Sequence, residues 1–152
     1  MLVRFYRDSD FNSISAVEKK AFREGAYSNY MLKIMLNSPH GFTMVVEDSS
    51  SIYGYATMEP LDSNSVDIES IGIIPEQHGK GLGSLLIEAM EAEAARRGYR
   101  EVFLEVREKN AGAIDFYKKH GYTIFEFLTG YYTLSYEGST NAYRMKKIIQ
   151  YC

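Results

Sequence analysis

The residues with the clearest chemical potential are glycines between a predicted strand and a predicted helix. Gly79, Gly81 and Gly83 alternate in His78-Gly79-Lys80-Gly81-Leu82-Gly83-Ser84, shortly after an apolar run that ends at Ile74. Small residues let backbone N–H groups approach an anion, and a helix start offers unpaired N–H donors and the positive end of a dipole. No acidic residue follows until after Ile87. The loop is a candidate phosphate site, although glycines also make tight turns in proteins that bind nothing.

Two well-known phosphate-binding patterns do not fit this loop. The ATP-binding pattern requires a lysine directly after its last glycine, and here Ser84 follows Gly83. The dinucleotide-binding pattern requires a third glycine at the position of Ser84. Both classes of site are therefore excluded.

Glu105 is the strongest candidate for acid–base chemistry. It lies in Val102-Phe103-Leu104-Glu105-Val106-Arg107, where apolar residues alternate as in a central strand. A carboxylate is costly to bury there unless it has a partner or a function. Glu105 could be a general base that takes a proton from an attacking amine, or it could form an ion pair with Arg107 or another basic group.

Asp67 and Glu69 are two further candidate acids on the strand that precedes the glycines. If no bulge shifts the phase, both share a strand face with Ile71 and Ile73. Either acid could then help to bind or deprotonate an amine. The alternative is that both lie, solvated, at the wet end of the strand.

The elements that position these residues follow from periodicity, turn residues and helix caps. Seven strands are expected at residues 2–6, 42–47, 52–58, 66–74, 101–107, 122–128 and 142–149. Four helices are expected from Ser9 or Asp10 to 22 and at 28–37, 81–97 and 110–120. Asn110 is a suitable N-cap for the last of these helices. This order predicts a mixed α/β layer, and the length of 152 residues suggests one domain over 1–152.

Composition excludes several functional classes. The net charge is -3 and no block of Lys and Arg occurs, so a nucleic-acid partner is not expected. Cys152 is the one cysteine and the three histidines are scattered, so neither a disulfide, a thiolate zinc cluster nor another metal site is expected. No apolar run approaches the ~20 residues of a membrane span, and the first residues read as a strand rather than a signal peptide. A cytoplasmic protein without membrane contact is expected.

The glycine loop resembles the [Q/R]-x-x-G-x-[G/A] acetyl-CoA motif of the GNAT N-acetyltransferases, with His78 where Gln or Arg is usual. The order of elements is similar to the GNAT fold along the whole chain. The resemblance implies a sheet of about seven strands that splays between strands 4 and 5, flanked by about four helices. It also implies that backbone groups near the splay bind pantetheine and that the loop binds pyrophosphate. The implied cofactor-binding set is Ile71, Gly72, Ile73, His78, Gly79, Lys80, Gly81, Leu82, Gly83, Ser84, Asn110 and Tyr117.

Tyr117 completes the family's N-x-x-A-x-x-x-Y pattern, which begins at Asn110. In GNAT enzymes this tyrosine lies beside the CoA sulfur and acts as general acid, and the asparagine contacts pantetheine. A tyrosine on such a helix face is otherwise typical of core packing.

A narrower resemblance points to the N-terminal (Nα) acetyltransferases, which include the ribosomal-protein alanine acetyltransferases. It rests on Leu104-Glu105-Val106-Arg107-x-x-Asn110, on Tyr131-Tyr132 and on Asn141-Ala142-Tyr143. It implies that Glu105 is the catalytic carboxylate, with Asp67 or Glu69 at a second catalytic position, and that Tyr131 and Tyr132 hold the substrate backbone. The segment 24–30, with Ala26 and Tyr27, would shape the pocket for the first substrate side chain. Asn141 replaces the usual Asp, and the segment 24–30 lacks the usual proline; the paired tyrosines could also be edge-strand aromatics.

The expected activity is transfer of acetyl from acetyl-CoA to the α-amine of a protein or peptide, by direct attack in a ternary complex. No cysteine is placed to carry the acetyl group. An α-amine has a pKa of about 7.7–8.0, against about 10.4 for lysine, so a carboxylate base can deprotonate it more easily. The alternatives are an acetyltransferase for lysine side chains or small amines, a non-catalytic CoA-binding regulatory domain, and a subunit that needs an auxiliary partner. A monomer or weak homodimer is expected.

Overall fold

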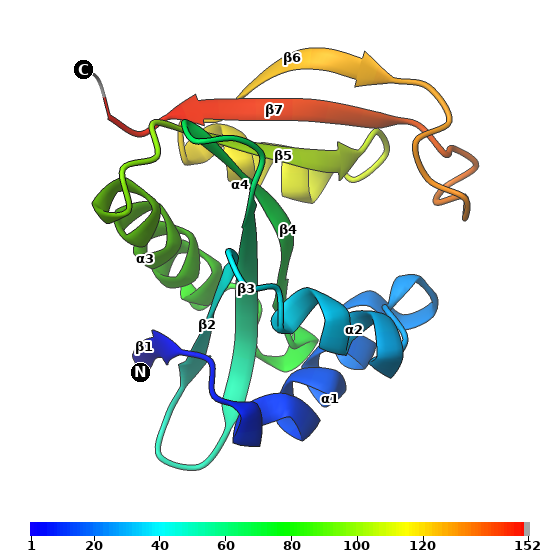
Figure 1. Cartoon of the computed structure of the whole chain (residues 1–152). Coiled ribbons are helices and arrows are strands. Elements are labelled where there is room, and N and C mark those ends of the chain that lie inside the picture. The colour runs from blue at the N-terminus through cyan, green and yellow to red at the C-terminus, as the bar shows by residue number, and fades with distance from the viewer. Residues whose placement is uncertain (151–152) are drawn as a thin grey trace.

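The computed structural model describes residues 1–150, which form one seven-stranded sheet in the order β1-β2-β3-β4-β5-β7-β6 (Figure 1). Cys152 lies outside the described residues. The strands are β1 (Leu2–Phe5), β2 (Phe42–Glu47), β3 (Ile52–Pro60), β4 (Ser65–Ile73), β5 (Glu101–Arg107), β6 (Thr123–Leu128) and β7 (Ala142–Ile148). The helices are α1 (Phe11–Phe22), α2 (Asn29–Leu36), α3 (Leu82–Arg96) and α4 (Ala111–Lys119). The predicted α/β order is confirmed, with every boundary within two residues of expectation.

Local capping explains where two of the four helices begin. Ser28 caps α2 by accepting a hydrogen bond from the Met31 N–H at 3.2 Å, and Asn110 caps α4 by accepting from the Ala113 N–H at 3.2 Å. Asp10 does not cap α1 with its side chain, because its carboxylate accepts from Arg4 and from the Arg7 N–H instead. Residues 8–10 form a 3-10 turn, and Asp10 is the N-cap residue of α1 by position, as predicted, but without a side-chain cap.

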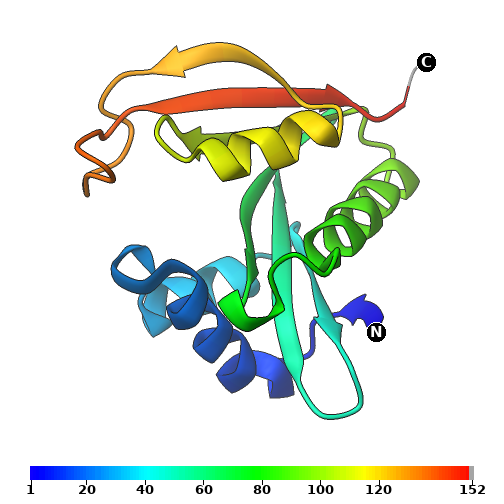
Figure 2. The ribbon, with the colours of Figure 1, turned by 180° about the vertical axis from the view of Figure 1, so that it is seen from behind.

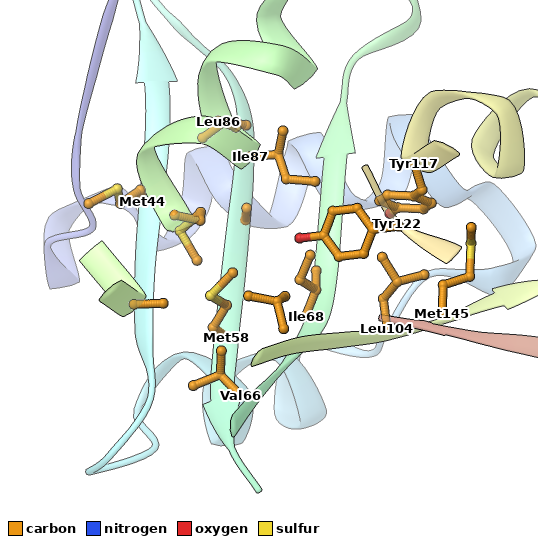
Figure 3. Close-up of a cluster of buried hydrophobic side chains, with 14 of the residues drawn as sticks. Met44, Met58, Val66, Ile68, Leu86, Ile87, Leu104, Tyr117, Tyr122 and Met145 are labelled. Atoms are coloured by element: carbon orange, nitrogen blue, oxygen red, sulfur yellow. The ribbon is translucent and has the colours of Figure 1, made fainter. Parts of the chain in front are cut away.

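The helices cover opposite faces of the sheet and enclose two apolar clusters. The larger cluster lies between α3, α4 and the central strands, and Figure 3 shows Tyr117 and Tyr122 among its aliphatic side chains. The smaller cluster joins α1 and α2 to the other face through Val45 and Tyr55. Figure 2 shows α3 and α4 from behind, with α4 lying along β5 and β7.

The sheet opens between β4 and β5. These parallel strands pair only over Ser65–Ile68 and Glu101–Leu104. Beyond that point β4 pairs with β3 alone, and β5 pairs with β7 alone. Figure 1 shows β5, β7 and β6 running across the direction of β2, β3 and β4. We call the unpaired edges, residues 69–73 of β4 and 105–107 of β5, the strand opening; the predicted splay is confirmed.

A β-bulge at Glu69 changes the face on which Asp67 lies. On β3, Thr57 pairs with Ser70 and the adjacent Met58 pairs with Ile68, so Glu69 is the extra residue. Ile68, Ile71 and Ile73 pack against the cluster under α3. Asp67, next to Ile68, therefore points to the opposite face of the sheet. The expectation that Asp67 shares a face with Ile71 and Ile73 is wrong, because the bulge shifts the alternation by one residue.

Candidate active site

The backbone of β4 presents polar groups to the strand opening at alternate residues. The Ile74 N–H donates to the Tyr53 carbonyl at 2.9 Å, so Ile74 lies in a hydrogen-bonded pair with β3. By the alternation of an antiparallel ladder, Gly72 also bonds to β3, whereas Ile71 and Ile73 turn their N–H and C=O groups away from it. Ile71 and Ile73 are thus oriented as the resemblance implies.

Gly72 has a different role from the one predicted. Its backbone groups face β3, so they are not open to a ligand. A Cβ at this position would lie 2.9 Å from Cε2 of Phe22, which is too close for a side chain. The residue is glycine because α1 packs directly on β4 at this point.

The glycine loop leaves the start of α3 without side-chain acceptors. Gly79 and Gly81 have φ angles of 79° and 80°, in the left-handed region that favours glycine. Gly81 is the N-cap of α3, makes no side-chain cap, and no acidic residue follows in the first turn. The N–H groups of this turn keep their positive character for an anion.

The other residues of the loop have separate structural roles. A Cβ on Gly83 would lie 3.1 Å from Cε1 of Phe116, so this glycine lets α3 and α4 approach closely. The Ser84 Oγ lies 3.0 Å from His120 Nε2, which ties the same two helices together. The Leu82 side chain is buried in the core. Only the backbone of Leu82 is therefore placed for the predicted cofactor contact.

The two remaining loop side chains, His78 and Lys80, are exposed. The His78 Nε2 lies 2.8 Å from the Ile73 carbonyl oxygen, one of the groups that face the strand opening. A ligand that used this carbonyl would share it with the imidazole, through the second lone pair of the oxygen, or would displace the imidazole.

Glu105 is paired with Arg144 rather than with Arg107. Val102, Leu104 and Val106 point into the core under α3 and α4, so Glu105 points to the other face. There the Arg144 Nε donates to Glu105 Oε2 at 2.9 Å, and Arg144 Nη1 donates to the exposed Glu126 at 3.0 Å. The expected ion-pair alternative is thus present, with a partner that strand β7 brings directly opposite Glu105.

Asp67 lies close to Glu105 and carries the most perturbed carboxyl group of this region. It is 6% exposed, and its Oδ1 has no hydrogen-bond partner among the described residues. Burial, followed by the charge of Glu105, raises the pKa of Asp67 far above its usual value. Desolvation and the charge of Glu105 also raise the pKa of Glu69. Asp67 and Glu105 can therefore hold one proton and one negative charge between them.

Tyrosines from two loops lie near these acids. The Tyr131 and Tyr132 rings make an edge-to-face contact at 4.9 Å, in the loop between β6 and β7. Burial, followed by the charges of Glu105 and Asp67, raises the pKa of Tyr131 to about 12. Tyr27, in the loop between α1 and α2, has its pKa raised by burial and then by the charge of Glu69. Ala26 is half-buried beside Tyr27 in the same loop.

Arg107 contacts the loop between β6 and β7, which carries Tyr131 and Tyr132. Its guanidinium lies 3.9 Å from the centre of the Tyr132 ring, and its Nη1 donates to the Leu134 carbonyl at 2.7 Å. Asn141 closes the same loop: it accepts from the Gly130 N–H at 2.9 Å and donates to Glu108 at 3.2 Å. The N-terminal acetyltransferases that this sequence resembles have Asp at the position of Asn141. An aspartate could not donate to Glu108, which accounts for the asparagine here.

Tyr117 lies on the core side of the sheet. It is 8% exposed on α4, with its ring edge-on to Tyr122 at 5.8 Å, as the packing alternative predicts. Burial, followed by the charges of Tyr132 and Asp67, raises the pKa of its hydroxyl.

Sequence reasoning missed Arg144, and it missed a buried pair formed by Glu18 and Tyr55. Arg144 alternates with apolar residues on β7, a pattern that indicates only a strand. Its pairing with Glu105 depends on the register between β5 and β7. The described residues contain no cluster of three or more His, Cys, Asp or Glu side chains suited to a metal ion, and no helix among them is long and apolar enough to span a membrane.

Comparison with known proteins decides the family. The sequence pattern described as "Acetyltransferase (GNAT) family" matches residues 6–122. The chain belongs to the GNAT acetyltransferases. An uncharacterized N-acetyltransferase of Mycobacterium bovis is 32% identical over 89 residues, 59% of this chain and 57% of that relative, so the match spans less than two thirds of the relative's length. The N-alpha-acetyltransferase RimI of Mycobacterium tuberculosis is 29% identical over 115 residues, 74% of this chain and 69% of RimI.

Solved structures of other GNAT proteins superpose on nearly the whole chain. The ribosomal-protein-S18-alanine N-acetyltransferase from Escherichia coli has a TM-score of 0.90 at 20% identity, with 99% of this chain and 95% of that chain covered. Ard1 from Thermoplasma volcanium has a TM-score of 0.85 at 26% identity, with coverage of 99% and 98%. An aminoglycoside 6'-N-acetyltransferase from Enterococcus faecium has a TM-score of 0.84 at 16% identity, with coverage of 100% and 99%. The GNAT fold therefore does not by itself identify the amine that is acetylated.

Proposed function

We propose that the chain transfers the acetyl group of acetyl-CoA to the α-amine of a protein or peptide N-terminus. The observation that carries the proposal is that Glu105 and Arg107 share one face of β5 beside the strand opening, and that Arg107 there stacks on the ring of Tyr132, which contacts Tyr131. The acids suit an amine that must lose a proton, and the loop tyrosines suit a peptide that runs past it.

The residues present fit acetyl-CoA. Two phosphates would bind the N–H groups at the start of α3, next to Gly79 and Gly81. The amides of pantetheine would pair with the backbone groups of Ile71 and Ile73, which face the strand opening. When bound, acetyl-CoA supplies the acetyl group as a thioester; Asn110 and Tyr117, at the start and in the middle of α4, are proposed to contact its thiol end.

The proton balance of the transfer requires one base and one acid. The acceptor nitrogen forms a bond to the acetyl carbon as the carbon–sulfur bond breaks. Glu105 takes the proton that the nitrogen loses, directly or through a water, with Asp67 or Glu69 assisting. Tyr117 gives a proton to the departing sulfur, so that a thiol rather than a thiolate leaves. The buried Tyr117 holds its proton firmly until then, since burial raises its pKa.

A peptide acceptor is supported by the loop that carries Tyr131 and Tyr132. Cation–π and hydrogen-bond contacts of Arg107 and Asn141 hold this loop, and fixed aromatic walls suit an extended backbone better than a freely rotating small amine. The names of two similar proteins, the N-alpha-acetyltransferase RimI and the ribosomal-protein-S18-alanine N-acetyltransferase, are consistent with this choice.

The deciding experiment is turnover of acetyl-CoA on matched short peptides. Each sequence is made with a free or a blocked α-amine, with or without a lysine, and an aminoglycoside is tested in parallel. We expect acetylation of free α-amine peptides, at rates that depend on the first residue, and none of the blocked ones. Equal turnover of blocked lysine peptides would move the assignment to side-chain amines, and turnover of the aminoglycoside alone would move it to small amines.

The same assay, combined with calorimetry, distinguishes an enzyme from a domain that only binds the cofactor. Heat on titration with coenzyme A but no turnover of any amine would favour a CoA-binding regulatory domain. Turnover by the isolated chain would show that no auxiliary subunit is required. We propose a cytoplasmic monomer or weak homodimer, which sedimentation of the purified chain would test.

A further inference from the structure

Glu18, a buried carboxylate on α1, takes no part in the chemistry proposed above. Its side chain is 1% exposed, and it has no Lys, Arg or His partner among the described residues. Each carboxylate oxygen accepts one hydrogen bond. The Tyr55 hydroxyl donates to Oε1 at 2.5 Å, and the Tyr27 backbone N–H donates to Oε2 at 2.8 Å.

This pair of hydrogen bonds joins the loop between α1 and α2 to the centre of the sheet. Tyr55 is fully buried on β3, and its hydroxyl lies 3.0 Å from the Ser70 Oγ on β4. Ser70 directly follows the bulge at Glu69 and precedes Ile71, where β4 faces the strand opening. The chain of contacts therefore runs from the Tyr27 backbone to the strand that would hold the acetyl donor.

Tyr27 is linked to the part of β4 that carries a candidate catalytic acid. Its N–H is connected through Glu18 and Tyr55 to Ser70, which directly follows Glu69. Its ring is 38% exposed, and burial of the rest, followed by the charge of Glu69, raises the pKa of its hydroxyl. Under the proposed function this ring is a wall of the acceptor site. Whatever fixes the backbone of Tyr27 also fixes this wall of the acceptor site.

Burying a carboxylate without a cation at this position costs free energy. Burial raises the pKa of Glu18, because the charged form loses its hydration without gaining a cation. A glutamine of the same shape would avoid the charge, but it has only one acceptor oxygen for two donors. The carboxylate accepts from both groups as they stand, whereas a glutamine would have to donate to the Tyr55 hydroxyl, which would then have to turn its hydrogen towards Ser70.

We propose that Glu18 is a positioning residue for the acceptor: it holds the loop between α1 and α2 so that Tyr27 forms one wall of the acceptor site. The inference rests on the proposed function. If Glu18 has this role, the affinity for the acceptor depends on Glu18 although the acceptor does not touch it. Binding of acetyl-CoA would depend on the start of α3 and on the backbone of β4, which the β3–β4 ladder holds in place without Glu18.

Glu18→Gln is the direct test. We expect the KM for a free α-amine peptide to rise about tenfold, as for the loss of a hydrogen bond to a charged group, with the KM for acetyl-CoA within about twofold of wild type. Hydrogen exchange at the Tyr27 amide should accelerate about tenfold while exchange in β3 stays unchanged. The acceptor-KM effect of Glu18→Gln should shrink in a Tyr27→Ala background, because both changes act on the same wall.

A matched control and a second variant keep the test decisive. Glu93→Gln removes another buried carboxylate, on α3, that binds Arg96 and Arg97 away from the site; it should leave the acceptor KM unchanged. Tyr55→Phe removes one donor to Glu18 and should raise the acceptor KM about threefold. This second variant tests the inference if Glu18→Gln does not fold.

The outcomes separate the inference from the proposed function. No turnover by the wild type would overturn the function, and exchange at the Tyr27 amide would still decide whether Glu18 holds the loop. Turnover by the wild type with an unchanged acceptor KM in Glu18→Gln would overturn the inference alone. Equal increases in both KM values would also overturn it, because they would indicate general damage.

Discussion

Arg144 gives Glu105 and Asp67 different environments although the two side chains lie close together. Its guanidinium donates to Glu105 and, at its outer end, to Glu126, whereas Asp67 Oδ1 has no partner among the described residues. Glu105 thus lies opposite a cation, whereas the unpartnered, buried position of Asp67 favours its protonated form. One carboxyl group of the pair is thus equipped to receive a proton.

Glu105→Gln should lower kcat by about 100-fold or more, because loss of a positioned general base typically costs that much. The affinity for acetyl-CoA, measured by calorimetry, should stay unchanged. Glu126→Gln is the matched control, since it removes the other carboxylate from Arg144 and should leave kcat within about twofold. An unchanged kcat in Glu105→Gln would reject the base assignment.

Asp67 should make the protein less stable as the pH rises. Its folded pKa is raised, so between its usual value and the raised value the folded chain binds more protons than the unfolded chain. The free energy of unfolding then falls with pH, by at most ~1.4 kcal/mol per pH unit. We expect Asp67→Asn to gain stability relative to wild type between about pH 5 and 8, as measured by urea unfolding.

Asp62→Asn provides the control for this pH dependence. The Asn64 N–H lowers the pKa of Asp62, so its titration is complete below that range. The stability difference between this variant and wild type should stay constant from about pH 5 to 8. A constant difference for Asp67→Asn as well would show that Asp67 does not retain a proton in the folded state.

At the residue scale, the sequence predicts which side chains are chemically unusual better than it predicts their partners. Glu105 is identifiable because it interrupts an apolar strand, and the partnership with Arg144 is not, because it depends on strand register. The prediction for the orientation of Asp67 is wrong for the same reason: the bulge at Glu69 exists only in the pairing with β3.

At the scale of elements, the turn before α3 determines how the cofactor site is built. Gly81→Ala should cost ~1–2 kcal/mol of stability, because the φ of 80° is unfavourable for a side chain. It should also weaken coenzyme A binding about tenfold in calorimetry, since the first N–H groups of α3 would move.

Gly98→Ala isolates the strain from the binding effect. Gly98 follows the other end of α3 with a φ of 95°, and a Cβ there would meet nothing within 4 Å. We expect a similar loss of stability with unchanged coenzyme A affinity. If both variants bind coenzyme A like wild type, the turn is not the phosphate site.

Element positions are predictable here because their signals are local. Caps such as Ser28 and Asn110, and glycines such as Gly98, mark ends within a few residues. Asp10 is the exception: it binds Arg4 on β1, a contact between two elements that no helix-start pattern contains.

At the scale of the whole molecule, the sheet consists of β1–β4 and β5–β7 joined by four residue pairs between Ser65–Ile68 and Glu101–Leu104. Periodicity predicts strands but does not determine how they are ordered, so the strand order and the opening follow from the family resemblance and not from the residues alone. The apolar cluster under α3 and α4 continues beneath both parts, which keeps their edges in place where hydrogen bonding stops.

Where β4 and β5 separate, each strand keeps a backbone edge that no neighbouring strand uses. The start of α3 lies on one face of the sheet, and Asp67 and Glu105 point to the other. If the donor and the acceptor bind as proposed, they approach the strand opening from opposite faces. An inhibitor that joins a coenzyme A analogue to a peptide would then occupy both half-sites with a single molecule.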